Sequence, residues 1–132
     1  MKIIKIILII FIITFATGIF VFNQSDSIMK INIYTRYMIF MNNFVDKKHI
    51  VMWLENYHGE APNVEKLRIF IEWGIKNKQE FIKILRIVNF KTREKMSWVV
   101  CDSNIKNIFY KEFEYSESNN INFIIKGIKK CK

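Results

Sequence analysis

The sequence predicts an all-α protein, in which one N-terminal hydrophobic signal or anchor helix precedes a small irregular bundle of about six or seven short amphipathic helices. Three observations predict this class. Close to its N-terminus the chain has a long apolar run, Ile6 to Phe22, that contains no charged side chain. Beyond it, apolar residues recur every three or four positions, as on one face of a helix, and the alternation typical of strands is rare. Finally, the 132 residues include only one Pro and four Gly, so few sharp turns are marked.

The N-terminal hydrophobic helix is expected within residues 1–22. Lys2 and Lys5 precede an uncharged apolar run from Ile6 to Phe22. Counted from Ile3, the segment has 20 residues. A helix of that length rises about 30 Å, which matches the hydrocarbon thickness of a bilayer. The sequence therefore predicts that this segment reaches a membrane.

Two uses of this segment remain open. Ala16-Thr17-Gly18 places small residues where a signal peptide is cut, so cleavage after Gly18 is one alternative. Because the apolar run continues from Ile19 to Phe22, an uncleaved transmembrane anchor fits slightly better. In both cases the basic residues before the run stay on the cytoplasmic side. Residues 23–132 then form an extracytoplasmic helical domain, either secreted or anchored to the membrane.

The composition of residues 23–132 predicts one domain with a single modest core. Its formal charge is +7, because the whole chain carries +9, Lys2 and Lys5 precede it, and all 12 acidic residues lie within it. The excess of basic residues argues for the reverse topology, but long domains cross membranes largely regardless of charge. The charge favours an acidic partner or an anionic surface such as lipid headgroups, with solvated surface charge as the simpler alternative. Nucleic acid is not expected as a partner outside the cytoplasm.

The first segment after the leader is predicted to be a central helix from Ser27, its N-cap, to about Phe44. Two of its faces are apolar, and a helix that is apolar on two sides is usually buried on both. One face carries Ile28, Ile31, Thr35 and Met38, and the other carries Ile33, Tyr37, Phe40 and Phe44.

Six further helices are predicted from shorter apolar stripes. These stripes are Ile50, Trp53, Leu54 and Tyr57; Val64, Leu67, Ile71 and Ile75; Phe81, Ile84, Leu85 and Val88; Met96, Val99 and Val100; Ile105, Ile108, Phe109 and Phe113; and Ile121, Ile124, Ile125 and Ile128. Gly59 is expected to end the first of these helices, and Thr92 and Asn120 are expected to cap two others. Breaks are predicted at Asp102-Ser103-Asn104 and over residues 116–120.

The two cysteines of the chain, Cys101 and Cys131, are predicted to form a disulfide, as a lone pair does in a small domain outside the cytoplasm. The bridge closes a loop of about 30 residues, for which the chain-entropy description gives a stabilisation of about 3 to 4 kcal/mol. Two free thiols are the alternative if the domain faces a reducing compartment.

No catalytic, cofactor-binding or metal-binding constellation is expected. Glu55 and His58 form one E-x-x-H pair on a predicted helix, but a di-iron bundle needs this motif twice. His49 is the only other histidine, so a zinc site with three histidines cannot be built. Asp102 and Ser103 have neither a nearby histidine nor the glycine-bearing turn of an activated nucleophile. A structural role is predicted for each of these residues.

Two tryptophans are candidates for partner binding. Trp73 and Trp98 lie off the apolar stripes of their helices, and exposed Trp is enriched at binding surfaces. A wide core stripe is the alternative explanation for both. A basic rim near Trp73 is predicted from Lys76, Lys78, Lys83 and Arg86, with a solvated face as the alternative.

These features favour a non-enzymatic extracytoplasmic protein that binds another macromolecule. The most concrete version is an inhibitor or immunity-type protein that neutralises a toxin or hydrolase, and its partner is expected to be a protein with an acidic surface. The alternative is a single-pass structural subunit of a cell-envelope assembly that residues 1–22 anchor in the membrane. An enzyme is the least expected class.

Overall fold

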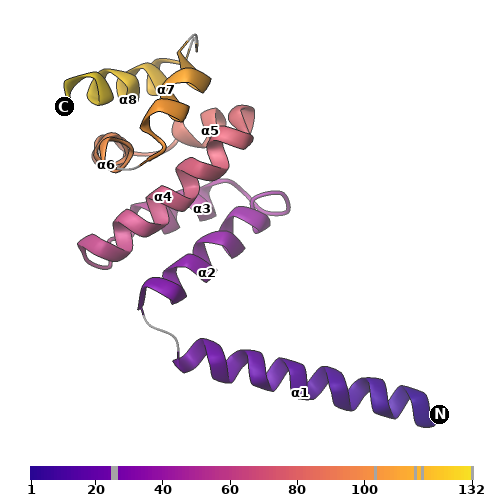
Figure 1. Cartoon of the computed structure of the whole chain (residues 1–132). Coiled ribbons are helices and arrows are strands. Elements are labelled where there is room, and N and C mark those ends of the chain that lie inside the picture. Colours follow the sequence, from indigo (N-terminus) through magenta and orange to yellow (C-terminus); the bar gives the residue numbers. More distant parts are fainter. Residues whose placement is uncertain (25–26, 103, 115, 117, 132) are drawn as a thin grey trace.

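The structure is a computed structural model that describes residues 1–24, 27–102, 104–114, 116 and 118–131, and every regular element in these residues is an α-helix. Figure 1 shows a separate N-terminal helix and a bundle of shorter ones, which confirms the predicted fold class. The helices are α1 (Lys2–Gln24), α2 (Ser27–Met41), α3 (Lys48–Glu55), α4 (Glu60–Lys76), α5 (Lys78–Leu85), α6 (Phe90–Cys101), α7 (Lys106–Phe113) and α8 (Asn119–Lys130).

The hydrophobic helix α1 projects away from the bundle (Figure 1). Its segment Lys2–Val21 has a mean hydropathy of 2.7, and none of it is buried against the rest of the chain. Among the described residues, α1 is the helix whose length and composition suffice to cross a membrane. Exposed apolar side chains along such a length need an apolar environment, which a bilayer supplies. A signal sequence has the same properties, so both predicted uses of this segment remain open.

The central helix of the bundle is α4, which packs against α2, α3, α5, α6 and α7. Leu67, Phe70 and Ile71 in its middle are fully buried. The sequence-based expectation that residues 27–44 form the central helix is wrong. α2 packs mainly against α4 and α3, and only one of its faces is covered, with Ile31, Thr35 and Ile39 buried.

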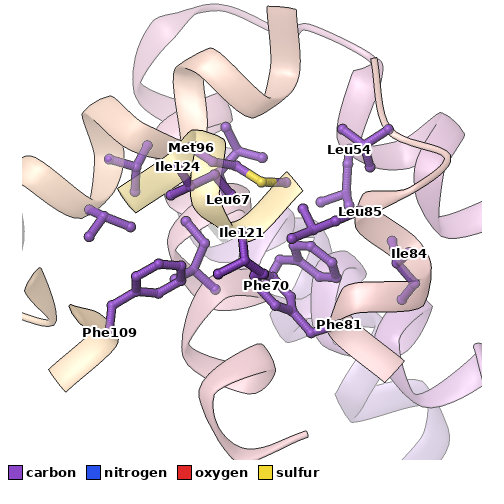
Figure 2. Close-up of a cluster of buried hydrophobic side chains, with 14 of the residues drawn as sticks. Leu54, Leu67, Phe70, Phe81, Ile84, Leu85, Met96, Phe109, Ile121 and Ile124 are labelled. Carbon is purple, nitrogen blue, oxygen red and sulfur yellow. The ribbon is translucent and has the colours of Figure 1, made fainter. Parts of the chain in front are cut away.

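Aromatic rings from three helices form the centre of the core (Figure 2). Phe81 of α5 packs against Phe70 of α4, with ring centroids 5.0 Å apart, and against Phe113 of α7 at 5.6 Å. Phe81 also lies directly on the backbone of α4 at Gly74, where an added Cβ would come within 2.2 Å of the Phe81 ring. Gly74 is therefore required for close approach of α5 to α4.

Several helix ends differ from the sequence-based expectation. Asn89 rather than Thr92 caps α6, because its side chain accepts a hydrogen bond from the Thr92 backbone N–H at 2.8 Å. Similarly, Ser118 rather than Asn120 caps α8, by accepting from the N–H of Ile121 at 3.4 Å. In both cases the pattern pointed to a polar residue inside the first turn instead of the one before it.

Gly59 begins a helix rather than ending one. α3 ends at Glu55, before Tyr57, and Gly59 is the N-cap of α4 with a φ of 110°, which is a conformation that glycine adopts without steric cost. The predicted stop after α6 is confirmed at Asp102, its C-cap, while Ser103 lies outside the described residues.

One charged side chain, Lys66 of α4, is fully buried in the bundle. Its ammonium group donates hydrogen bonds to the carbonyl oxygen of Trp53, at 2.6 Å, and to that of Asn56. These carbonyls lie at the C-terminal end of α3, where the helix dipole favours a cation. Burial, aided by repulsion from Lys95, lowers the pKa of Lys66 from 10.5 to about 8.

The lowered pKa of Lys66 predicts a pH-dependent stability. Between pH 8 and pH 10.5 the unfolded chain keeps a proton that the folded chain has released. The contribution of Lys66 to the free energy of unfolding should therefore rise with pH across this window and be constant below it. Urea denaturation of the parent and of Lys66→Met at a series of pH values measures the difference. Lys48→Met, at an exposed position, controls for the loss of one positive charge. If the parent and Lys66→Met differ in free energy of unfolding by the same amount at every pH, the lowered pKa of Lys66 is contradicted.

Candidate functional site

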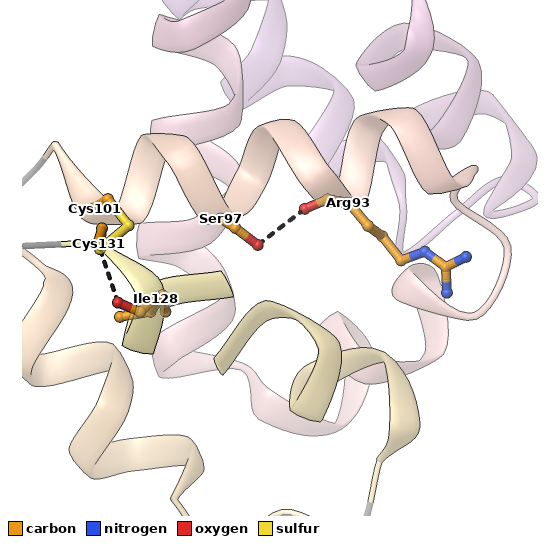
Figure 3. Close-up of a disulfide and its surroundings, with 5 residues drawn as sticks. All are labelled: Arg93, Ser97, Cys101, Ile128 and Cys131. Atoms are coloured by element: carbon orange, nitrogen blue, oxygen red, sulfur yellow. Dashed lines mark hydrogen bonds between the residues drawn. A yellow bond between two sulfur atoms is a disulfide. The ribbon is translucent and has the colours of Figure 1, made fainter. Parts of the chain in front are cut away.

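The candidate site is a groove between α6 and α8, which pack closely against each other. Their C-terminal halves touch where Gly127 of α8 faces Ser97 of α6, and a Cβ at Gly127 would lie 2.7 Å from the Ser97 side chain. The Ser97 hydroxyl donates back to the Arg93 carbonyl within α6, as Figure 3 shows, so its hydrogen bond does not compete with this contact. Two small residues thus set the narrow separation of the helices.

Each end of this helix pair is fastened. At the C-terminal end, Cys101 and Cys131 form the predicted disulfide, which joins residues 30 positions apart (Figure 3). At the opposite end, the ring of Phe90 packs edge-on against that of Phe123, with centroids 5.1 Å apart. The guanidinium of Arg93, on the same turn of α6, donates to the side chain of Asn120. The groove therefore has fixed walls.

The outer side of the pair is hollowed into a cavity of about 600 Å³ that is mostly apolar. From α6 and its C-cap it is lined by Phe90, Glu94, Ser97, Trp98, Cys101 and Asp102, and from α8 and its C-cap by Phe123, Lys126, Gly127, Lys130 and Cys131. We call this feature the α6–α8 groove. The charges around the groove are separated by sign. Glu94 and Asp102 lie on the α6 side, and Lys126 and Lys130 lie on the α8 side.

Trp98 stands at the edge of the α6–α8 groove and is 68% exposed. Its neighbours along α6, Val99 and Val100, point into the core, so the helix turn that buries them directs Trp98 outward. A large ring exposed beside an apolar hollow with a charged rim is the arrangement found at the anchor points of protein interfaces.

The other candidate tryptophan, Trp73, is placed differently. It is half-buried, packs against the core and stacks on Phe70 with centroids 5.7 Å apart. Its remaining surface lines a shallow groove between α2 and α4, together with Phe40 and Lys76. The structure therefore does not bring Trp73 and Trp98 into one groove.

Only part of the predicted basic rim lies near Trp73. Lys76 shares its groove, but Lys78 forms an ion pair with Glu112, which lowers the pKa of that carboxyl group. Lys83 pairs with Glu80 at 3.2 Å, and Arg86 is exposed after the end of α5. A contiguous rim of four free cations is therefore not formed.

The E-x-x-H residues do not share a helix face. Glu55 ends α3 and accepts a hydrogen bond from the Asn89 backbone N–H at 2.8 Å, whereas His58 lies beyond the helix and packs against Trp53. The described residues contain no group of three or more His, Cys, Asp or Glu side chains that could hold a metal ion.

Sequence reasoning did not identify most of the groove. Phe90, Phe123, Lys126 and Lys130 were not predicted as site residues. Phe123 was detectable, because it lies off the isoleucine stripe of its helix just as Trp98 lies off the stripe of α6. Only the packing of α6 on α8 shows that Phe123 and Trp98 line the same hollow.

Comparisons of the chain with known protein families, with curated proteins and with solved structures found no match.

Removing the disulfide tests how far the groove depends on it. The double substitution Cys101→Ser and Cys131→Ser should lower the free energy of unfolding by about 3 to 4 kcal/mol, because the unfolded chain regains the entropy of a loop of about 30 residues. Urea denaturation of parent and variant measures this loss. An unchanged midpoint would show that the two helices hold together without the bridge.

Proposed function

We propose that the chain is a non-enzymatic extracytoplasmic protein that binds a partner protein through the α6–α8 groove. One observation carries the proposal, namely the exposed Trp98 at the edge of a preformed apolar groove. An exposed Trp ring is costly in water, and its burial against a partner would recover that cost. Because α6 and α8 are linked at both ends, the groove loses little conformational entropy on binding, which also favours binding of a partner.

The charged residues of the groove favour a partner with charges of both signs. Glu94 and Asp102 on one side would meet basic groups, and Lys126 and Lys130 on the other would meet acidic groups. The net charge of +7 on residues 23–132 adds a long-range attraction for acidic proteins, since the chain total of +9 includes Lys2 and Lys5. An inhibitor or immunity-type protein that neutralises a toxin or hydrolase is the most concrete form of this function.

The role of Trp98 can be tested with a partner recovered by affinity capture from the native host. Trp98→Ala should weaken binding of that partner by about 30-fold or more, which is the effect of removing an interface anchor worth about 2 kcal/mol. Calorimetric titration measures the affinity. Ile108→Ala removes a side chain on α7 that is 52% exposed and serves as the control, with an expected affinity equal to that of the parent.

Equal affinity of the Trp98→Ala variant and the parent would contradict binding through the groove. Capture of lipid or wall polymer with no protein would contradict the proposed class of partner. Circular dichroism of each variant separates a loss of contact from a loss of fold, and Trp98 is exposed enough for its removal to leave the bundle folded.

The second candidate function is a single-pass structural subunit of an envelope assembly, with α1 as a permanent anchor. It is favoured by the exposure of Lys2–Val21, the described apolar segment of α1. Retention of α1 is also our proposal for the binding protein, because the apolar run passes the candidate cleavage point at Gly18.

Retention of α1 predicts that the protein extracted from the membrane fraction of its host still contains residues 1–18. Mass spectrometry of that fraction provides the measurement. A shorter species that begins at Ile19 and is recovered in soluble form would exclude permanent anchoring by α1, and with it the structural-subunit function.

A further inference from the structure

The outward face of α2 carries an apolar stripe formed by Ile33, Tyr37, Phe40 and Phe44, which we call the outer stripe. The first three residues lie on one side of the helix, at intervals of four and three, and Phe44 follows in the turn after Met41. Their exposed fractions are 40%, 55%, 61% and 69%, respectively. This is the second apolar face that the sequence predicted to be buried, and no described part of the bundle covers it.

The outer stripe forms part of a wider apolar surface. The rings of Phe40 and Phe44 are in contact, with centroids 5.4 Å apart. Phe40 also lines the shallow groove in which Trp73 lies between α2 and α4. A contiguous apolar surface of this kind usually marks a face that another apolar phase or molecule covers.

The hydrophobic helix α1 lies beside the start of the outer stripe. A hollow between the two helices is lined by Thr14, Gly18 and Val21 of α1 and by Met29 and Ile33 of α2. α1 ends at Gln24 and α2 begins at Ser27, so the start of α2 stays within about 10 Å of the end of α1. If α1 crosses a bilayer, α2 therefore begins close to the bilayer surface.

The polar residues around the outer stripe suit an anionic surface. Arg36 flanks it on α2, and Lys76 borders the groove of Phe40 and Trp73. The carboxylate in this groove, Glu72, is already paired with Arg68 at 2.7 Å. Aromatic side chains between basic ones are typical of helices that lie in the interface of a membrane.

We propose that α2 lies flat in the headgroup region of the bilayer that α1 crosses, with the outer stripe inserted among the lipids. This inference rests on the proposed retention of α1. It assigns the second apolar face of α2 to lipid, rather than to a second copy of the chain or to another protein.

The test uses the full chain in vesicles of phosphatidylcholine and phosphatidylglycerol. A photoreactive benzoylphenylalanine replaces Phe40 in one variant and Ile108, exposed to a similar extent on α7, in the control. After irradiation, mass spectrometry should find lipid adducts at position 40 in about tenfold or greater excess over position 108, because interfacial side chains reach the acyl boundary. A third variant with the photoreactive residue at Tyr37 should give the same result if substitution of Phe40 impairs folding.

The outcomes separate this inference from the proposed anchoring. The intact mass of the same sample reports whether α1 is present and retained in the vesicles. Crosslinks between two chains, or equal lipid labelling at positions 40 and 108, would overturn the assignment of the outer stripe to lipid while leaving α1 as the anchor. Lipid adducts at positions 37 and 40 that persist in a chain beginning at Ile19 would support the assignment and overturn only the need for α1.

Discussion

The enclosure of α4 is the constraint on which the rest of the bundle depends. Five helices pack around it, and Gly74 allows one of them to approach until Phe81 lies on its backbone. Phe81 then meets Phe109 and Phe113 of α7, so the position of α7 is fixed through the same contact. Because interiors are close-packed, a shift at Gly74 would be transmitted along this ring cluster.

The α6–α8 groove is a consequence of this core. Ser97 and Gly127 let the pair approach closely enough for Cys101 to reach Cys131. With Val99 and Val100 directed inward, Trp98 and Phe123 are left on the outer side of the pair. Geometry that serves packing therefore also positions the candidate site.

Local patterns in the sequence were sufficient to predict the helices and the disulfide. All four isoleucines of the stripe in α8 are buried, because that helix has a single apolar face and this face packs on the core. The same reasoning failed for α2, whose two apolar faces look alike in sequence. Only the three-dimensional arrangement shows that α4 covers the face of Ile31 and that the bundle leaves the face of Phe40 open.

The candidate site could be predicted only in part, because the sequence does not show which off-stripe residues the packing of the helices covers. Trp73 and Trp98 both lie off their stripes, yet Trp73 stacks on Phe70 beside α2 while Trp98 remains 68% exposed. The pairing of Lys78 with Glu112 joins α5 to α7, and no periodicity within either helix predicts it. Contacts between distant segments decide which exposed residues remain available to a partner, and a single sequence does not specify them.

The two proposed surfaces lie at opposite ends of the bundle. α2 lies nearest to α1, α4 follows, and α6 and α8 form the far end in Figure 1. An anchor helix alone would let the bundle rotate, and Trp98 could then enter the membrane interface, where tryptophan is readily accommodated. Insertion of the outer stripe would prevent this rotation, since it fixes a second helix to the lipid. The α6–α8 groove would then open away from the membrane, where a soluble partner protein can reach it without displacing headgroups.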